Sequence, residues 1–108
     1  MFKVKTNKEL KDLVNKLVEE RGYECDLNDI DVSEITDMSY LFYGSKFNGD
    51  ISKWDVSKVK YMYSMFEKSK FNRDISNWNV SNVEDMRWMF KNSEFKGDIS
   101  NWNTNINN

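Results

Sequence analysis

Acidic side chains are the most obvious candidates for chemistry in this 108-residue chain, which has one cysteine and no histidine. The run from Asp26 to Glu34 invites a calcium-loop interpretation. An EF-hand loop needs oxygen ligands at alternate positions, with glycine sixth and glutamate twelfth. Counting from Asp26 places Ile30 at the fifth position, and counting from Asp29 places Glu34 at the sixth. Both registers fail, so we expect no metal site and interpret the run as a solvated acidic segment.

The residue counts remove several other classes of function. Without histidine, the chain cannot build a Ser-His-Asp triad or an imidazole metal ligand. A single cysteine cannot form a zinc site or an internal disulfide. The net charge of −2 argues against nucleic acid and anionic membranes as partners. We therefore expect no cofactor and no enzyme activity; a carboxylate-based ligand-binding or hydrolytic domain stays open as the alternative of a different class.

The segment at Met1–Lys5 has no apolar stretch of the kind found in signal peptides, and no cysteine lies near it to serve as a lipobox. The sequence has no run near the ~20 apolar residues of a membrane span. We therefore expect a cytoplasmic protein without a membrane partner. The sole cysteine, Cys25, shares a repeat position with Gly49 and Arg73, which predicts an exposed turn and a free thiol. The lack of Ala, Pro, His and Gln indicates an AT-rich bacterial or phage genome.

A 24-residue repeat organises most of the chain. Phe47, Phe71 and Phe95 lie 24 residues apart. Columns of isoleucine, tryptophan, aspartate, methionine and a second phenylalanine keep the same step. The repeat divides the chain into an N-terminal segment and four units: 1–22, 23–46, 47–70, 71–94 and a partial unit 95–108. We expect these segments to form one structural domain.

Each unit has two halves with different patterns. Asp50–Trp54 alternates its apolar residues, which predicts a very short strand. Val59, Met62 and Phe66 then follow a helical stripe, preceded by Ser57 as a helix cap, which predicts a helix of about ten residues. This order predicts an α/β fold: a short right-handed leucine-rich-repeat-like solenoid of about 3.5 coils.

The N-terminal segment differs from the repeats. It carries a short strand pattern at Phe2–Lys5, a capping box at Thr6–Glu9 and an amphipathic stripe that ends before Gly22. These signals predict a cap helix over residues 7–21 that covers the first coil. The last coil has no matching cap, so we expect its open end to fray or to pair with another chain, including self-association.

The columns F-N-x-D-I-S-x-W-D/N-V-S-x-V-x-x-M-x-x-M-F resemble the BspA-like leucine-rich-repeat surface proteins, also described as the mycoplasma lipoprotein repeat. The resemblance covers about residues 23–103. It implies a leucine-rich-repeat-like solenoid, and adhesion or protein interaction rather than catalysis. It carries over no catalytic residue.

Two repeated columns could be functional but have simpler structural interpretations. The Asp50, Asp74 and Asp98 column could bind a cation, but each carboxylate is expected to accept hydrogen bonds from its own turn. The tryptophan column at Trp54 and Trp78 could stack on sugars or bases, but large rings that recur in every unit favour a core ladder. Trp102 belongs to the same column and is expected to be partly exposed.

Aromatic residues outside the repeated columns have no such explanation in folding. The columns of Tyr40, Tyr61 and Tyr63 hold Ser, Asp or Arg in other units, which indicates solvent-facing positions. On the predicted helices they would either form the centre of a protein-binding face or fill gaps between neighbouring helices. These candidate residues are Tyr40, Tyr43, Tyr61, Tyr63 and Trp88. We therefore expect a non-catalytic protein-protein interaction module, either a phage or mobile-element inhibitor of a host protein or a surface adhesin-type fragment.

Overall fold

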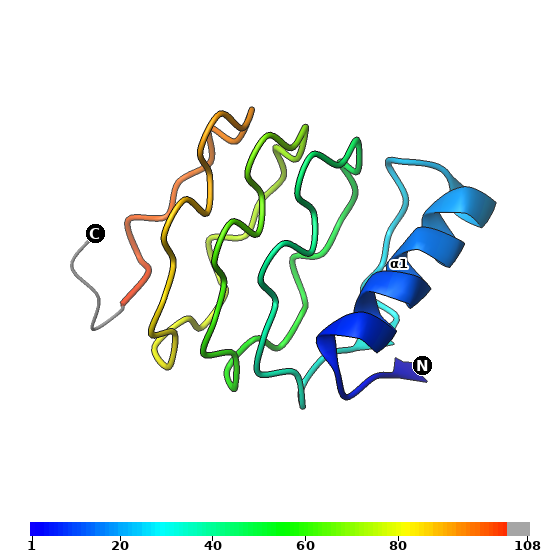
Figure 1. Ribbon diagram of the computed structural model, residues 1–108, viewed down its shortest axis with the longest axis horizontal. Coiled ribbons are helices and arrows are strands. Elements are labelled where there is room, and N and C mark those ends of the chain that lie inside the picture. Colours follow the sequence, from blue (N-terminus) through cyan, green and yellow to red (C-terminus); the bar gives the residue numbers. More distant parts are fainter. Residues whose placement is uncertain (104–108) are drawn as a thin grey trace.

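Helix α1 (Asn7–Arg21) forms one end of the molecule (Figure 1). The Thr6 hydroxyl accepts a hydrogen bond from the Glu9 backbone N–H at 3.1 Å, and the Gly22 N–H donates to the Val18 carbonyl. These contacts satisfy backbone groups at both helix ends. The buried face of α1 consists of Leu10, Val14 and Leu17. The helix predicted over residues 7–21 is confirmed.

Two short parallel strands lie at the same end. The computed structural model describes residues 1–103, in which β1 (Phe2–Lys3) pairs with β2 (Ile30–Asp31). Phe2 lies opposite Ile30. The sequence predicted an N-terminal strand, and its pairing with β2 ties the start of the chain to the first repeat unit.

The predicted leucine-rich-repeat-like α/β solenoid of about 3.5 coils is wrong. Within residues 1–103 the molecule is a compact globule with one helix and two short parallel strands, and no helix or multi-residue strand recurs in the repeat units. Its Cα radius of gyration is 12.6 Å, near the ~13 Å expected for a compact chain of this length. The strand predicted at Asp50–Trp54 is reduced to one isolated parallel bridge, between Asp26 and Asp50.

Within residues 1–103 the predicted short helices are absent, because the backbone N–H groups of these segments bond elsewhere. In the second unit, the N–H groups of Met62 and Phe66 donate to carbonyls of the third unit, those of Asp85 and Met89, both at 2.8 Å. The intervening Met65 N–H closes a tight turn onto Met62. Since an α-helix needs each N–H to bond four residues back, this alternation excludes it. The apolar spacing that indicated a helix belongs to a series of turns.

Left-handed backbone also interrupts each of these segments. Tyr40, Ser64 and Trp88 occupy one repeat column and have φ values of 61°, 53° and 59°. A second column does the same at Gly44, with φ 61°, and at Lys68, with φ 60°. Residues other than glycine adopt such backbone angles singly and not within helices. The repeat therefore conserves a turn geometry that is incompatible with the predicted helix.

Successive units lie side by side in chain order (Figure 1). Their repeated aromatic residues form part of the core. Phe42 stacks on Phe66 at 5.4 Å between ring centroids, and Trp54 stacks on Trp78 at 6.4 Å. The Trp78 indole N–H donates to the Ile51 carbonyl at 3.1 Å, so the ring is buried without an unsatisfied donor. The prediction of a buried tryptophan ladder is confirmed.

Helix α1 also satisfies the backbone carbonyls of the first unit. The Asn7 side-chain amide donates to the carbonyls of Asp37 and Ser39, at 3.0 and 3.1 Å. The Lys11 ammonium donates to the Leu41 carbonyl at 2.6 Å, and burial lowers the pKa of Lys11. The equivalent carbonyls of later units accept from the preceding unit instead. The helix thus takes the place of a preceding unit: it covers the apolar side chains of the first unit and donates hydrogen bonds to its carbonyls.

Candidate protein-binding surface

Four of the five aromatic residues singled out from the sequence form one connected surface cluster. Tyr40 contacts Tyr43 and Tyr63, with ring centroids 5.8 and 5.2 Å apart, and Tyr63 contacts Trp88 at 5.5 Å. Tyr40 is 49% exposed and Trp88 is 54% exposed, while Tyr63 between them is half-buried. We call Tyr40, Tyr43, Tyr63 and Trp88 the aromatic ridge. It crosses all three complete repeat units.

Tyr61 does not belong to the ridge. Its ring is 44% exposed, but no aromatic ring of residues 1–103 pairs with it. Its backbone forms parallel bridges with Asp37 on one side and Asp85 on the other. The structure therefore groups four of the five candidates and leaves Tyr61 as a separate exposed ring.

The backbone beneath the ridge is unfavourable for the residues that occupy it. Tyr40 and Trp88 have positive φ, which costs about 1–2 kcal/mol for a side chain with a Cβ. Ser64 holds the equivalent position in the second unit and is completely buried. The turn is thus a property of the repeat, while the large exposed rings at residues 40 and 88 are not needed to form it.

Basic side chains lie over the ridge. Lys68 lies over the Tyr43 ring at 5.7 Å, Arg87 over Tyr63 at 5.2 Å, and Lys91 over Trp88 at 5.0 Å, each measured from the charged group to the ring centroid. Such cation–π contacts hold the cations beside the rings. The ridge therefore combines apolar area with positive charge, which the aromatic columns alone did not predict.

One of these cations is already paired. Arg87 forms an ion pair with Asp85, with 2.9 Å between Nη2 and Oδ2, and this interaction lowers the pKa of Asp85. Lys68 and Lys91 take part in no ion pair with another described residue. The two lysines at the ends of the ridge are therefore the cations with charge left to offer a ligand.

The repeated carboxylates do structural work, as predicted. Asp50 accepts hydrogen bonds from the backbone N–H and the hydroxyl of Ser52, at 2.9 and 2.7 Å. These bonds lower the pKa of Asp50 to about 2. Asp74 and Asp98 each accept a hydrogen bond from the backbone N–H of the serine two positions on, at 2.9 and 2.8 Å. Each carboxylate is held ionised by its own turn, which suits a structural acceptor rather than a general acid.

The acidic run that suggested calcium is used in the same local manner. Asp31 accepts from both the backbone and the hydroxyl of Ser33, and Asp29 forms an ion pair with Arg21 at 3.0 Å. Cys25 is half-buried rather than exposed, and burial raises the pKa of its thiol. The Cys25 side chain packs against the hydrophobic core, which the comparison with Gly49 and Arg73 did not predict.

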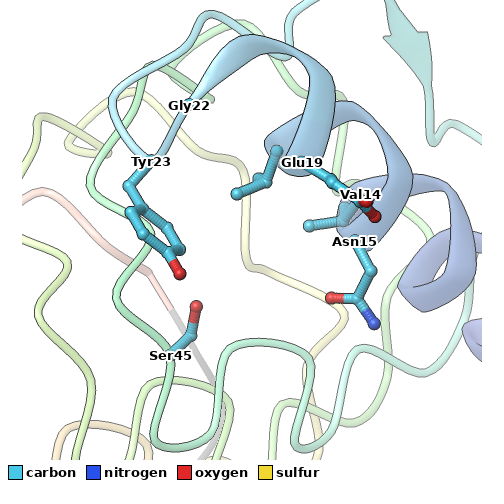
Figure 2. A pocket seen from close by; sticks show the side chains of 7 residues that line it. Val14, Asn15, Glu19, Gly22, Tyr23 and Ser45 are labelled. Carbon is cyan, nitrogen blue, oxygen red and sulfur yellow. The ribbon is translucent and has the colours of Figure 1, made fainter.

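A hollow of about 490 Å³ lies between the C-terminal part of α1 and the first unit (Figure 2). Val14 and Val18 line it from the helix, and Tyr23 and Ser45 line it opposite, with the Tyr23 and Ser45 side chains pointing toward each other in Figure 2. Its size suits a small ligand. This hollow could not be predicted from local sequence patterns, because Ser45 lies more than 20 residues from the other lining residues.

An apolar groove of about 360 Å³ lies at the opposite end of the molecule. Met86, Phe90, Ile99 and Trp102 are among its lining residues, with Trp88 at the side where it meets the ridge. Phe90, Ile99 and Trp102 are only half-buried. The prediction that Trp102 is partly exposed is confirmed, and the groove marks the end of the repeated core.

Among residues 1–103, no helix is long and apolar enough to span a membrane. The chain is thus a small compact protein with a 24-residue sequence repeat and an exposed cluster of aromatic residues. Residues 8–108 match the family DUF285, described as "Mycoplasma protein of unknown function", and the chain belongs to that family. Searches of the curated proteins and of the solved structures each found no match.

Proposed function

We propose that this chain is a non-catalytic protein-interaction module that binds a partner protein through the aromatic ridge. The observation that carries this proposal is the placement of Tyr40 and Trp88: two large, half-exposed rings on left-handed backbone. Ser64 adopts the same backbone conformation in the second unit, so the turn does not require a large ring. Glycine or asparagine would fit the turn better, so selection for the fold does not explain these rings.

The chemistry of the ridge suits a protein partner. Exposed tyrosine and tryptophan offer large rigid contact area and are the residues most enriched at interface hot spots. Lys68 and Lys91 flank the rings. We therefore propose a partner surface with an apolar centre and neighbouring carboxylates, which would complement both features.

The role proposed here is compatible with several biological settings. The resemblance to BspA-like surface proteins, which rests on the sequence columns, supports adhesion or protein interaction. A phage or mobile-element inhibitor acting in the cytoplasm would use the same ridge to cover a host protein. The alternative of a carboxylate-based enzyme has less support, because each aspartate with a shifted pKa has it lowered, whereas a general acid needs a raised one.

The proposal is tested by substitutions that the repeat itself supplies. Serine occupies the equivalent columns at residues 39 and 64, so a variant with Tyr40→Ser, Tyr63→Ser and Trp88→Ser should fold. Tyr23→Ser is the matched control, since Tyr23 is 53% exposed, lies beside Lys46 and is outside the ridge.

The measurement is quantitative capture of proteins from a mycoplasma cell lysate on the immobilised chain. We expect at least one protein to be retained by the wild type and the Tyr23→Ser variant, and reduced at least tenfold by the triple variant. Equal capture by all three, with thermal unfolding unchanged, would reject the ridge as the binding site.

A further inference from the structure

The third repeat unit ends in a row of backbone donors. In the first unit, the N–H groups of Met38, Tyr40 and Phe42 donate to carbonyls of the second unit at 2.8–3.0 Å, and that of Gly44 does so at 2.8 Å. The equivalent groups of the second unit donate to the third at 2.8–2.9 Å. The equivalent N–H groups of the third unit have no acceptor within residues 1–103. They belong to Met86, Trp88, Phe90 and Asn92.

This edge differs from the edge of an ordinary sheet because it offers donors without acceptors. The carbonyls of Met86 and Trp88 are used within the unit, accepting from Met89 and Lys91 at 3.1 and 3.2 Å. The carbonyls of the intervening residues point back to the second unit. An occupant of the edge must therefore supply carbonyl oxygens on alternate residues.

The apolar groove lies beside these donors, so one occupant could contact both. It is lined by Met86, Phe90 and Ile99 among others. Phe66, which is covered by a following unit, is fully buried, whereas Phe90 is left half-buried. An occupant that accepts hydrogen bonds from these donors would place its side chains in this groove. The third unit covers the apolar side chains of the second unit in the same way.

A second copy of the chain does not meet these requirements at either end. Two identical edges would place donors against donors. The other end of a copy has its carbonyls engaged, since Asp37 and Ser39 accept from Asn7, and Leu41 accepts from Lys11. A second copy therefore does not supply the carbonyl acceptors that this edge requires.

We propose that the edge formed by Met86, Trp88, Phe90 and Asn92 binds an extended segment of a partner protein. The segment presents carbonyls on alternate residues to the four donors and places methionine and aromatic side chains in the groove. The second unit provides the template, because its equivalent edge is covered by residues 84–94, with Met89 and Phe90 packed on Phe66 and its neighbours. Apart from Trp88, which contributes to both surfaces, this binding mode uses groups outside the ridge and does not rest on the proposed function.

The probe is a synthetic peptide with the sequence of residues 84–94, capped at both ends, titrated into the full-length ¹⁵N-labelled chain. We expect saturable binding at sub-millimolar peptide, with shifts at the four donor amides and at least tenfold slower hydrogen exchange there. The amides of Met62, Ser64 and Phe66 are already bonded and should not change.

Two controls keep the test specific. A peptide carrying Met89→Asp and Phe90→Asp should lose binding at least tenfold, as should the protein variant Ile99→Asp, while Tyr40→Ser should bind normally. No shift at 1 mM peptide, or binding that leaves the four amides unprotected, would overturn the proposal. So would a free protein that sediments as a dimer with those amides already protected, because a second copy would then be the occupant.

Discussion

Two sets of aromatic rings run across the same three units with similar spacing and opposite surroundings. In the buried set, Phe66 lies 5.4 Å from Phe42 and 5.6 Å from Phe90; in the ridge, Tyr63 lies 5.2 Å from Tyr40 and 5.5 Å from Trp88. The buried set repeats one residue type in one column. The ridge is assembled from neighbouring columns and different residue types.

The difference separates two reasons for having an aromatic residue. Every unit must cover the ring of the unit before it, so the phenylalanine column cannot vary without opening a cavity. The ridge has no such constraint, since Ser64 replaces its rings in the second unit and the turn is unchanged. We infer that repetition marks residues selected for folding, and that exposed departures from the repeat mark residues selected for binding.

The largest expected effect is on the buried set. Phe66→Ala should lower the free energy of unfolding by about 3–5 kcal/mol, because it removes a completely buried ring between two others. Denaturant unfolding monitored by tryptophan fluorescence measures this loss. A loss below about 0.5 kcal/mol would show that the column is not core.

The turns that hold the units together give the next effect. The pKa of Asp50 is about 2 in the folded protein, against 3.8 for an unperturbed aspartate. Because the folded protein favours the ionised form of Asp50, this carboxylate stabilises the fold fully above about pH 4. That stabilisation is lost as the pH falls toward 2. The melting temperature should fall across that window, and Asp50→Asn should melt lower at pH 7 and depend less on pH. Equal pH dependence of variant and wild type would contradict this assignment.

The smallest effect on stability is expected at the ridge, where substitutions should leave the free energy of unfolding unchanged or raise it slightly. Trp88→Gly and Tyr40→Gly relieve the positive φ of a bulky residue but also remove ring contacts and increase the entropy of the unfolded chain. We expect thermal stability to be unchanged or raised, by no more than about 1 kcal/mol. Differential scanning calorimetry distinguishes this from a loss greater than about 1 kcal/mol, which would place the ridge in the fold rather than in binding.

Sequence reasoning recovered what depends on local or repeated signals. The capping box at Thr6 and the apolar stripe of α1 gave the helix bounds, and the 24-residue columns gave the buried phenylalanines, tryptophans and turn aspartates. The hydrogen-bond partners of the repeated segments could not be found in this way. Apolar residues at every third or fourth position fit both a helix and a series of turns. Only the hydrogen bond from the Met62 N–H to the Asp85 carbonyl of the next unit decides between them.

The candidate site shows the same limit of local signals. The exposed aromatic residues were identified because their columns are polar in other units, although the helical face expected to carry them does not exist. Neither the separation of Tyr61 from the ridge nor the positions of Lys68 and Lys91 over its rings follow from the columns. These features depend on how the turns of neighbouring units are aligned in space.

The central claim, that the ridge binds a partner protein, is tested most directly by photo-crosslinking from single positions. The photoreactive residue p-benzoylphenylalanine replaces Tyr40 or Tyr63 in the ridge, and Tyr23 in the control, and each protein is irradiated in a mycoplasma cell lysate. We expect one discrete adduct of the same partner from both ridge positions and none from residue 23. The same adducts from all three positions, or none from the ridge, would contradict the claim.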